Sequence, residues 1–119
     1  MNTDELENTV QTALEEIKAV DVKVLDVRDS SSITDLMIIA TGNSTRHVKS
    51  IADSVMETVK KKGCKVLGVE GDKACDWVLV DMGDVVLHVM LADVREFYAL
   101  EKLWAVKQTD DNSDQDMTA

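Results

Sequence analysis

Several residue types are scarce or absent in this sequence of 119 residues, and each absence excludes a class of structure. There is no proline, so no cis-prolyl turn shapes a site. The two cysteines, Cys64 and Cys75, lie eleven residues apart without a second pair of metal ligands, which predicts reduced thiols rather than a disulfide framework or a zinc site. The start lacks a basic region followed by an apolar run, and no stretch reaches the ~18 apolar residues of a membrane span. We therefore expect a cytoplasmic protein with no membrane segment.

Positive charge is also scarce, because 13 Lys and Arg stand against 23 Asp and Glu for a formal net charge of -10. Most of the excess lies in residues 1–20 and 107–119, whereas residues 21–106 are nearly balanced. Binding to phosphate backbones depends on clustered Lys and Arg, so free nucleic acid is a poor candidate partner. Residues 107–119 hold almost nothing apolar, and we expect an acidic disordered tail after a single domain at 1–106.

Three segments have apolar residues at helical spacing. The first begins near Thr3, and the second begins after Ser44, a good cap, and ends before Gly63. A last helix is predicted from Val94 to about Val106. The apolar stripes are Leu6, Val10, Ala13, Leu14 and Ile17 in the first, Val48, Ile51, Ala52, Val55 and Val59 in the second, and Phe97, Leu100 and Trp104 in the third.

Strand-like segments fill the intervals between the helices. Residues 23–27 alternate, and residues 35–41 form a continuous apolar run that is typical of a strand buried on both faces in the middle of a sheet. The pattern in residues 64–76 predicts a short edge strand. A hairpin is predicted for residues 77–82 and 85–91, closed by a type II′ turn at Gly83-Asp84. The order of elements predicts an α/β or α+β fold, with a mixed sheet of about five strands packed with helices.

The hairpin register places two different surfaces back to back. Val78, Val80 and Met82 face Val89, Leu87 and Val85, which makes one side wholly aliphatic and suited to covering helices. The other side, here called the mixed face, carries aromatic, aliphatic, carboxylate and imidazole groups: Trp77, Leu79 and Asp81 opposite Met90, His88 and Val86. From the residues alone, this face is either covered by a further helix or free to dock a partner.

Several segments, in this order and spacing, resemble the ribosomal silencing factor (Iojap) family. They are Asp26-Val27-Arg28-Asp29, Ser31-Ser32-Ile33-Thr34-Asp35, residues 39–48 (IATGNSTRHV), Val69-Glu70-Gly71, residues 76–81 (DWVLVD), residues 83–90 (GDVVLHVM) and residues 95–104 (REFYALEKLW). The resemblance implies a nucleotidyltransferase-like topology and a homodimer-forming factor that binds the large ribosomal subunit through its ribosomal protein fourteen. It also implies that the factor blocks joining of the small subunit and lowers translation when nutrients are scarce. Met82, Ala74-Cys75 and residues 107–119 depart from the family pattern.

The mixed face is the candidate docking site for that partner. A central aromatic side chain among mixed neighbours is how small interfaces concentrate binding energy. Arg95 and Tyr98 are expected at the rim of the same face, where they would add a charge-assisted contact and an amphipathic ring. The candidate partner-binding residues are Trp77, Leu79, Asp81, His88, Met90, Arg95 and Tyr98. No cofactor, metal or catalytic residue is expected.

A small nucleotidyltransferase-like enzyme is the alternative. Gly42-Asn43-Ser44 precedes a helix and has the form of a turn whose backbone amides cradle phosphate. Such an enzyme also needs carboxylates for magnesium, and the close pair available is Asp81 and Asp84, across the hairpin turn, where Asp84 is better explained as a turn residue. His47 and His88 lack metal-ligand spacing and are expected to be structural imidazoles.

Overall fold

The computed structural model describes residues 2–29 and 34–98, with the backbone alone at Phe97 and Tyr98. In this part of the chain the elements run α1 (Thr3–Glu16), β1 (Val20–Asp26), β2 (Leu36–Gly42), α2 (Thr45–Lys61), β3 (Gly68–Glu70), β4 (Trp77–Asp81), β5 (Val85–Leu91) and α3 (Ala92–Tyr98). The predicted helix at 94–106 therefore begins two residues earlier, and its second half, like the predicted tail, lies outside the described residues.

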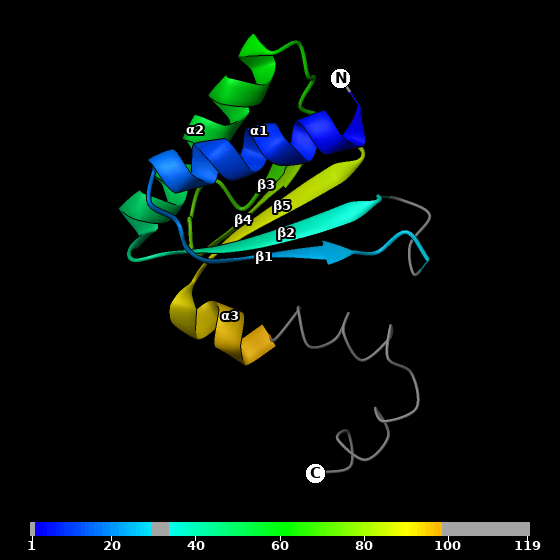
Figure 1. Cartoon of the computed structure of the whole chain (residues 1–119). Coiled ribbons are helices and arrows are strands. Elements are labelled where there is room, and N and C mark those ends of the chain that lie inside the picture. The colour runs from blue at the N-terminus through cyan, green and yellow to red at the C-terminus, as the bar shows by residue number, and fades with distance from the viewer. Residues whose placement is uncertain (1, 30–33, 99–119) are drawn as a thin grey trace.

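The strands form one mixed sheet in the order β1-β2-β5-β4-β3. Only β2 and β5 pair in parallel, and every other neighbouring pair in the described sheet is antiparallel. The helices α1 and α2 pack side by side over one face, and α3 lies on the other side, after the end of β5 (Figure 1). The predicted fold class, a mixed sheet of five strands packed with helices, is confirmed.

The main hydrophobic core lies between the sheet and the pair α1 and α2. It contains the predicted stripes of both helices together with the inward positions of the strands, among them Ile38, Val80 and Leu87, none of which is exposed to solvent. A second small cluster lies on the opposite face and consists of Val27, Met37 and Ile39. Because β2 contributes to both clusters, all seven of its residues are buried, as its unbroken apolar sequence predicts.

The helix starts follow from their capping residues. Asn2 and Glu5 form a capping box at α1, with the Asn2 side chain accepting a hydrogen bond from the backbone N–H of Glu5 at 2.8 Å. Ser44 caps α2 as predicted, because its Oγ accepts a hydrogen bond from the backbone N–H of His47 at 3.1 Å. At the other end of α2, Lys60 and Lys61 lie in the last turn, where positive charge favours the helix dipole.

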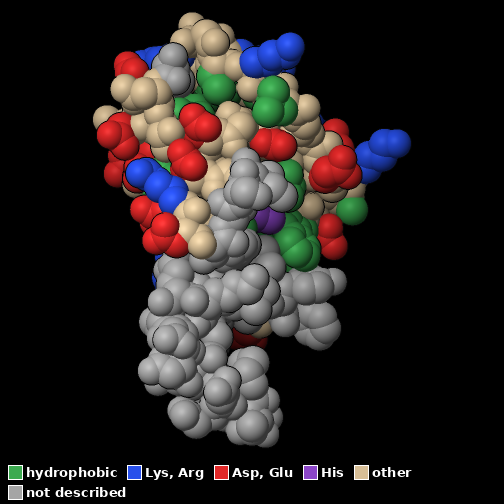
Figure 2. Space-filling model, turned by 90° about the vertical axis from the view of Figure 1, so that its right-hand side faces the viewer, with side chains coloured by type: hydrophobic (Ala, Val, Ile, Leu, Met, Phe, Trp, Pro, Cys, Tyr) green, Lys and Arg blue, Asp and Glu red, His purple; other side chains and the backbone are tan. Residues whose placement is uncertain are grey.

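The β4–β5 hairpin has the predicted register, with Trp77 opposite Met90, Leu79 opposite His88 and Asp81 opposite Val86. Gly83, in the hairpin turn, has a φ of +88°, a left-handed conformation that glycine adopts without strain. The observed register therefore places the residues of the mixed face on one side of the hairpin, as predicted. This side of the sheet faces away from α1 and α2. On the side of the molecule shown in Figure 2, acidic side chains outnumber basic ones on the described surface, and hydrophobic side chains appear between them.

Candidate functional site

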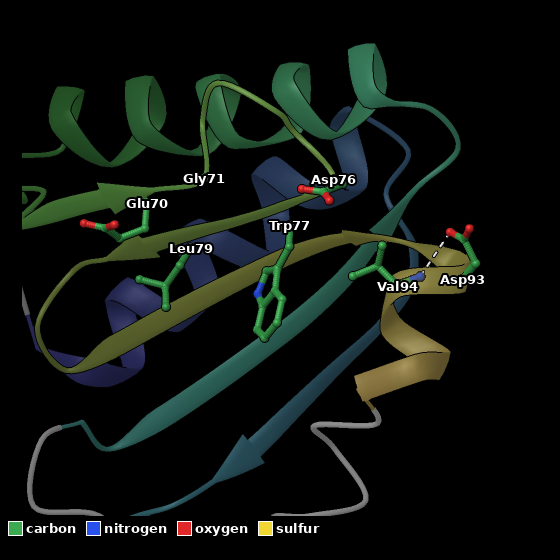
Figure 3. A pocket seen from close by; sticks show the side chains of 7 residues that line it. All are labelled: Glu70, Gly71, Asp76, Trp77, Leu79, Asp93 and Val94. Carbon is green, nitrogen blue, oxygen red and sulfur yellow. Dashed lines mark hydrogen bonds between the residues drawn. The ribbon is translucent and has the colours of Figure 1, made fainter.

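An open pocket of about 710 Å³ lies where β3, β4 and the start of α3 come together. Its apolar lining comes from Trp77, Leu79 and Val94, and its polar lining from three carboxylates, here called the acidic rim: Glu70, Asp76 and Asp93 (Figure 3). All three acidic residues are exposed to solvent, whereas Trp77 and Leu79 are half-buried. The pocket thus combines an aromatic ring with negative charge, which suits a partner that brings both apolar and positively charged groups.

Trp77 is held within this pocket by a hydrogen bond to His88, another residue of the mixed face. Its indole Nε1–H donates to the Nδ1 of His88 at 2.9 Å, and the two ring centroids lie 5.8 Å apart with planes tilted by 47°. Burial lowers the pKa of His88 from 6.5 to about 4, so near neutral pH the imidazole is uncharged and able to accept at Nδ1.

The loop before β4 also packs against Trp77. The backbone at Gly71 comes so close to the carbonyl of Trp77 that a Cβ on Gly71 would overlap the carbonyl oxygen. Gly71 itself has a φ of +81°, and its carbonyl accepts a hydrogen bond from the N–H of Cys75 at 3.0 Å. Only glycine satisfies both conditions, so the loop that carries Asp76 lies close against the backbone of Trp77.

The mixed face is partly exposed along β4 and buried along β5. Trp77, Leu79 and Asp81 of β4 are half-buried, whereas His88 is 6% exposed and Met90 not at all. The β4 half of the mixed face is therefore partly open to solvent, and the β5 half is buried. The carboxylate of Asp81 is engaged locally, since it accepts a hydrogen bond from the Gly83 N–H at 2.9 Å in the hairpin turn.

Arg95 does not lie at an exposed rim, and that expectation is wrong. The residue is 5% exposed, and its Nη1 donates hydrogen bonds to the backbone carbonyl of Asp21 at 2.6 Å and to the Thr41 hydroxyl at 2.9 Å. The Asp21 carboxylate lies 3.9 Å from Nη2. Through these buried hydrogen bonds, Arg95 connects α3 to β1 and β2. The backbone of Tyr98 ends α3, and the side chain lies outside the described residues.

The Gly42-Asn43-Ser44 turn uses its polar groups to join α1 to α2. The Nδ1 of His47 accepts a hydrogen bond from the Asn43 N–H at 2.9 Å, which leaves the ring proton on Nε2 to be donated to the Ile17 carbonyl at 3.1 Å. Ser44 Oγ is occupied by the His47 N–H. Two of the amides near this turn, those of Asn43 and His47, are thus already hydrogen-bonded within the protein.

Asp84, the second carboxylate of the alternative site, serves the turn and its surroundings. Its Oδ2 accepts a hydrogen bond from the Thr3 hydroxyl at 3.1 Å, and its backbone carbonyl accepts from the N–H groups of Asp35 and Leu36. Among residues 2–29 and 34–98, no group of three or more His, Cys, Asp or Glu side chains is placed to hold a metal ion. In the same ranges no helix is long and apolar enough to cross a membrane.

The sequence located part of this site. Trp77 and Leu79 were predicted and lie together in the pocket, whereas the acidic rim and Val94 were not predicted. Two signals pointed toward them: the Val69-Glu70-Gly71 and Asp76-Trp77 segments flank a polar loop, and Asp93 lies two residues after the end of β5. Their proximity depends on the turn at Gly71 and on the direction of α3.

Comparison with known proteins gives a consistent result. The family model described as "Ribosomal silencing factor during starvation" matches residues 1–119. The chain is similar to a ribosomal silencing factor of Haemophilus influenzae, with 48% identity, covering 77% of this chain and 90% of the relative. A ribosomal silencing factor of Chromobacterium violaceum is 45% identical, covering 87% of this chain and 85% of the relative.

A solved structure agrees with these relatives. A crystal structure of a protein from Chromobacterium violaceum superposes with a TM-score of 0.87 at 45% sequence identity, and the match covers 88% of each chain. A mouse protein described as a mitochondrial assembly protein of the ribosomal large subunit is 37% identical, covering 82% of this chain but 44% of the longer relative. The shared fold and the sequence similarity thus each extend over most of this chain.

Proposed function

This chain belongs to the ribosomal silencing factor family, and we propose that it represses translation by binding the large ribosomal subunit and sterically blocking its association with the small subunit. In this proposal the contact is made with ribosomal protein fourteen of the large subunit, in the cytoplasm, when nutrients are limited. The body of the domain fills space that the small subunit needs. Steric occlusion requires no catalytic group, so the protein acts without enzymatic activity.

The pocket that holds Trp77 is the observation that supports a docking site on the mixed face. A half-buried tryptophan beside Leu79 and Val94 offers apolar area to a partner, and the acidic rim offers opposite charge to a basic protein surface. The buried side chains of His88, Met90 and Arg95 contribute to docking indirectly, by supporting the exposed residues. The net charge of -10 favours protein rather than ribosomal RNA as the contact.

Co-sedimentation with separated ribosomal subunits tests this function, with a subunit-joining assay on the same samples. Wild-type protein should pellet with large subunits only and should block joining. Trp77→Ala should weaken binding by about 2 kcal/mol or more, roughly thirtyfold in Kd, because it removes a central aromatic contact. The matched control is Val20→Ala, which truncates a 41% exposed side chain on the far edge strand β1 and should bind as wild type does.

The outcomes separate function from location. Failure of the wild-type protein to bind large subunits at physiological salt would contradict the function itself. Binding that survives Trp77→Ala would keep the function and move the interface away from the pocket. Loss of binding in Val20→Ala as well as in Trp77→Ala would show that general destabilisation, rather than the pocket, explains the result.

The family resemblance further supports a homodimer of the free protein. If the dimer and the ribosome compete for one surface, inhibition per molecule should decline as the protein concentration rises through the dimer dissociation constant. Sedimentation equilibrium gives that constant, and titration of the joining assay across the same concentrations checks the competition. If inhibition per molecule does not change with protein concentration, the dimer interface and the ribosome-binding interface lie on different surfaces.

A further inference from the structure

We propose that His88 is a positioning residue for docking, which acts by holding the indole of Trp77 in the orientation that lines the pocket. His88 itself is too deeply buried to be a main contact, with 6% of its surface exposed. The inference rests on the proposed function for its biological meaning, and the hydrogen bond on which it depends is measured in the free protein.

The two side chains are diagonal neighbours on adjacent strands. His88 pairs directly with Leu79, and Trp77 pairs with Met90, so the rings meet across the mixed face rather than side by side in register. Side chains at diagonal positions reach each other only when both are long, and a hydrogen bond between two such rings fixes both orientations. The bond from Trp77 Nε1 to His88 Nδ1 is 2.9 Å long.

The hydrogen bond between the two rings can run in only one direction, from Trp77 to His88. An indole Nε1–H donates and cannot accept, so its partner must present a lone pair. His88 does so at Nδ1, which assigns the neutral tautomer with its proton on Nε2. Burial disfavours the imidazolium and lowers the pKa of His88 to about 4, which preserves the accepting form near neutral pH.

Fixing the indole matters because Trp77 is half-buried and borders an open pocket. An unrestrained indole at the edge of such a pocket samples several rotamers, and a partner then loses affinity in selecting one of them. Removing the restraint should weaken binding to the large subunit by about three- to tenfold, the effect of immobilising one side chain. This is smaller than the effect of removing the indole itself.

Two substitutions of the same shape separate the hydrogen bond from the packing. His88→Asn places Oδ1 on Cγ, where the imidazole has Nδ1, and so retains an acceptor. His88→Leu has the same number of heavy side-chain atoms and the same branching at Cγ as asparagine, is somewhat larger, and has no acceptor. If His88 acts through the bond, His88→Asn restores most of the affinity that His88→Leu loses. If His88 acts only by filling space, the apolar leucine is the better substitute in the buried site.

The spectroscopic readout is the indole ¹H–¹⁵N signal of Trp77 in the free protein. The sequence has two tryptophans, and the signal that disappears in Trp77→Phe identifies Trp77. We expect this signal in the wild type and in His88→Asn to show slow exchange with solvent, and in His88→Leu to show fast exchange and a changed chemical shift. Backbone amide spectra of each variant verify that it is folded.

Affinity for purified large subunits is then measured for each variant. An unchanged Trp77 signal in His88→Leu would overturn the proposal, and so would a lost signal with unchanged affinity. If His88→Leu does not fold, Trp77→Phe alone decides, because it removes the donor and keeps an aromatic ring: unchanged affinity overturns the proposal. If wild-type protein does not bind large subunits, the proposed function fails, while the exchange data still decide whether His88 holds the indole.

Discussion

His88 ionises differently in the folded and the unfolded chain. Burial lowers its pKa from 6.5 to about 4 in the folded state, so between these values the unfolded chain binds more protons. The contribution of His88 to the free energy of unfolding is therefore complete above pH 6.5 and declines as the pH falls toward 4. The full decline is on the order of 3 kcal/mol, from about 1.4 kcal/mol for each unit of pKa.

Chemical denaturation of wild type and His88→Asn at about pH 7.5 and about pH 4.5 measures this contribution. The wild-type protein should lose more stability on acidification than the variant does, because asparagine does not titrate. Carboxylates affect both proteins alike and cancel in the difference. Identical acid sensitivity in the two proteins would show that the folded state does not exclude the imidazolium.

Gly71 is a single residue on which the shape of the pocket depends. Gly71→Ala should lower the free energy of unfolding by about 2 kcal/mol or more, because the new Cβ adopts a left-handed φ and overlaps the Trp77 carbonyl. Gly63→Ala, also at positive φ but with open space, isolates the cost of the backbone angle and should be milder. Gly68→Ala has open space and no positive φ, and should not destabilise the fold. Equal unfolding midpoints for Gly71→Ala and Gly63→Ala would contradict the close approach.

At the scale of secondary structure, α3 depends on the buried Arg95. Arg95→Met retains the aliphatic stem and removes the hydrogen bonds to the Asp21 carbonyl and the Thr41 hydroxyl, which should cost about 1–3 kcal/mol. Because these bonds tie α3 to the sheet, amide hydrogen exchange in residues 92–98 should accelerate more than exchange in α2. The control is Arg46→Met at the exposed start of α2, which should leave both rates as they are. Unchanged exchange in residues 92–98 of Arg95→Met would mean that other contacts hold α3.

The elements were predictable where local pattern decides them. The hairpin register follows from alternation and from Gly83-Asp84, and α2 follows from its cap and apolar stripe. The start of β1 was missed by three residues because Asp21 has a φ of +51° and the pairing shifts between Val20 and Lys23, which breaks the alternation that marks a strand. The central strand is β5 rather than β2, although β2 is interior as expected.

The site was less predictable than the elements because it is assembled from distant segments. Trp77 and Leu79 were found because they alternate on one strand. The acidic rim comes from β3, the following loop and α3, and the proximity of these three segments is a tertiary property. Arg95 was misplaced because helical spacing does not show that the start of α3 turns its basic side chain toward β1.

At the scale of the whole molecule, charge should influence how quickly the protein finds its partner. Glu70→Gln, Asp76→Asn and Asp93→Asn together remove the acidic rim, and we expect association with large subunits to slow by about three- to tenfold at low salt. The dependence of the association rate on ionic strength should also weaken. Stopped-flow measurements over a range of salt concentrations check both effects.

A matched variant separates local from total charge. Asp4→Asn, Glu15→Gln and Glu16→Gln on α1 remove the same number of charges from exposed positions on the helix-covered side. This variant should keep most of the wild-type association rate and salt dependence if the acidic rim faces the partner. Equal slowing by the two triple variants would attribute the effect to net charge alone.

The parallel pairing of β2 with β5 also has a consequence for folding while the chain is being synthesised. Leu36 pairs with Val85, so β2 leaves the ribosome roughly fifty residues before its central neighbour is synthesised. At about 5–20 residues per second, this delay lasts for about 2–10 s. During that time a strand whose seven residues are all buried in the finished fold has only β1 to pair with. This member of a ribosomal silencing factor family thus depends, during its own synthesis, on keeping its fully buried strand from aggregating until β5 emerges.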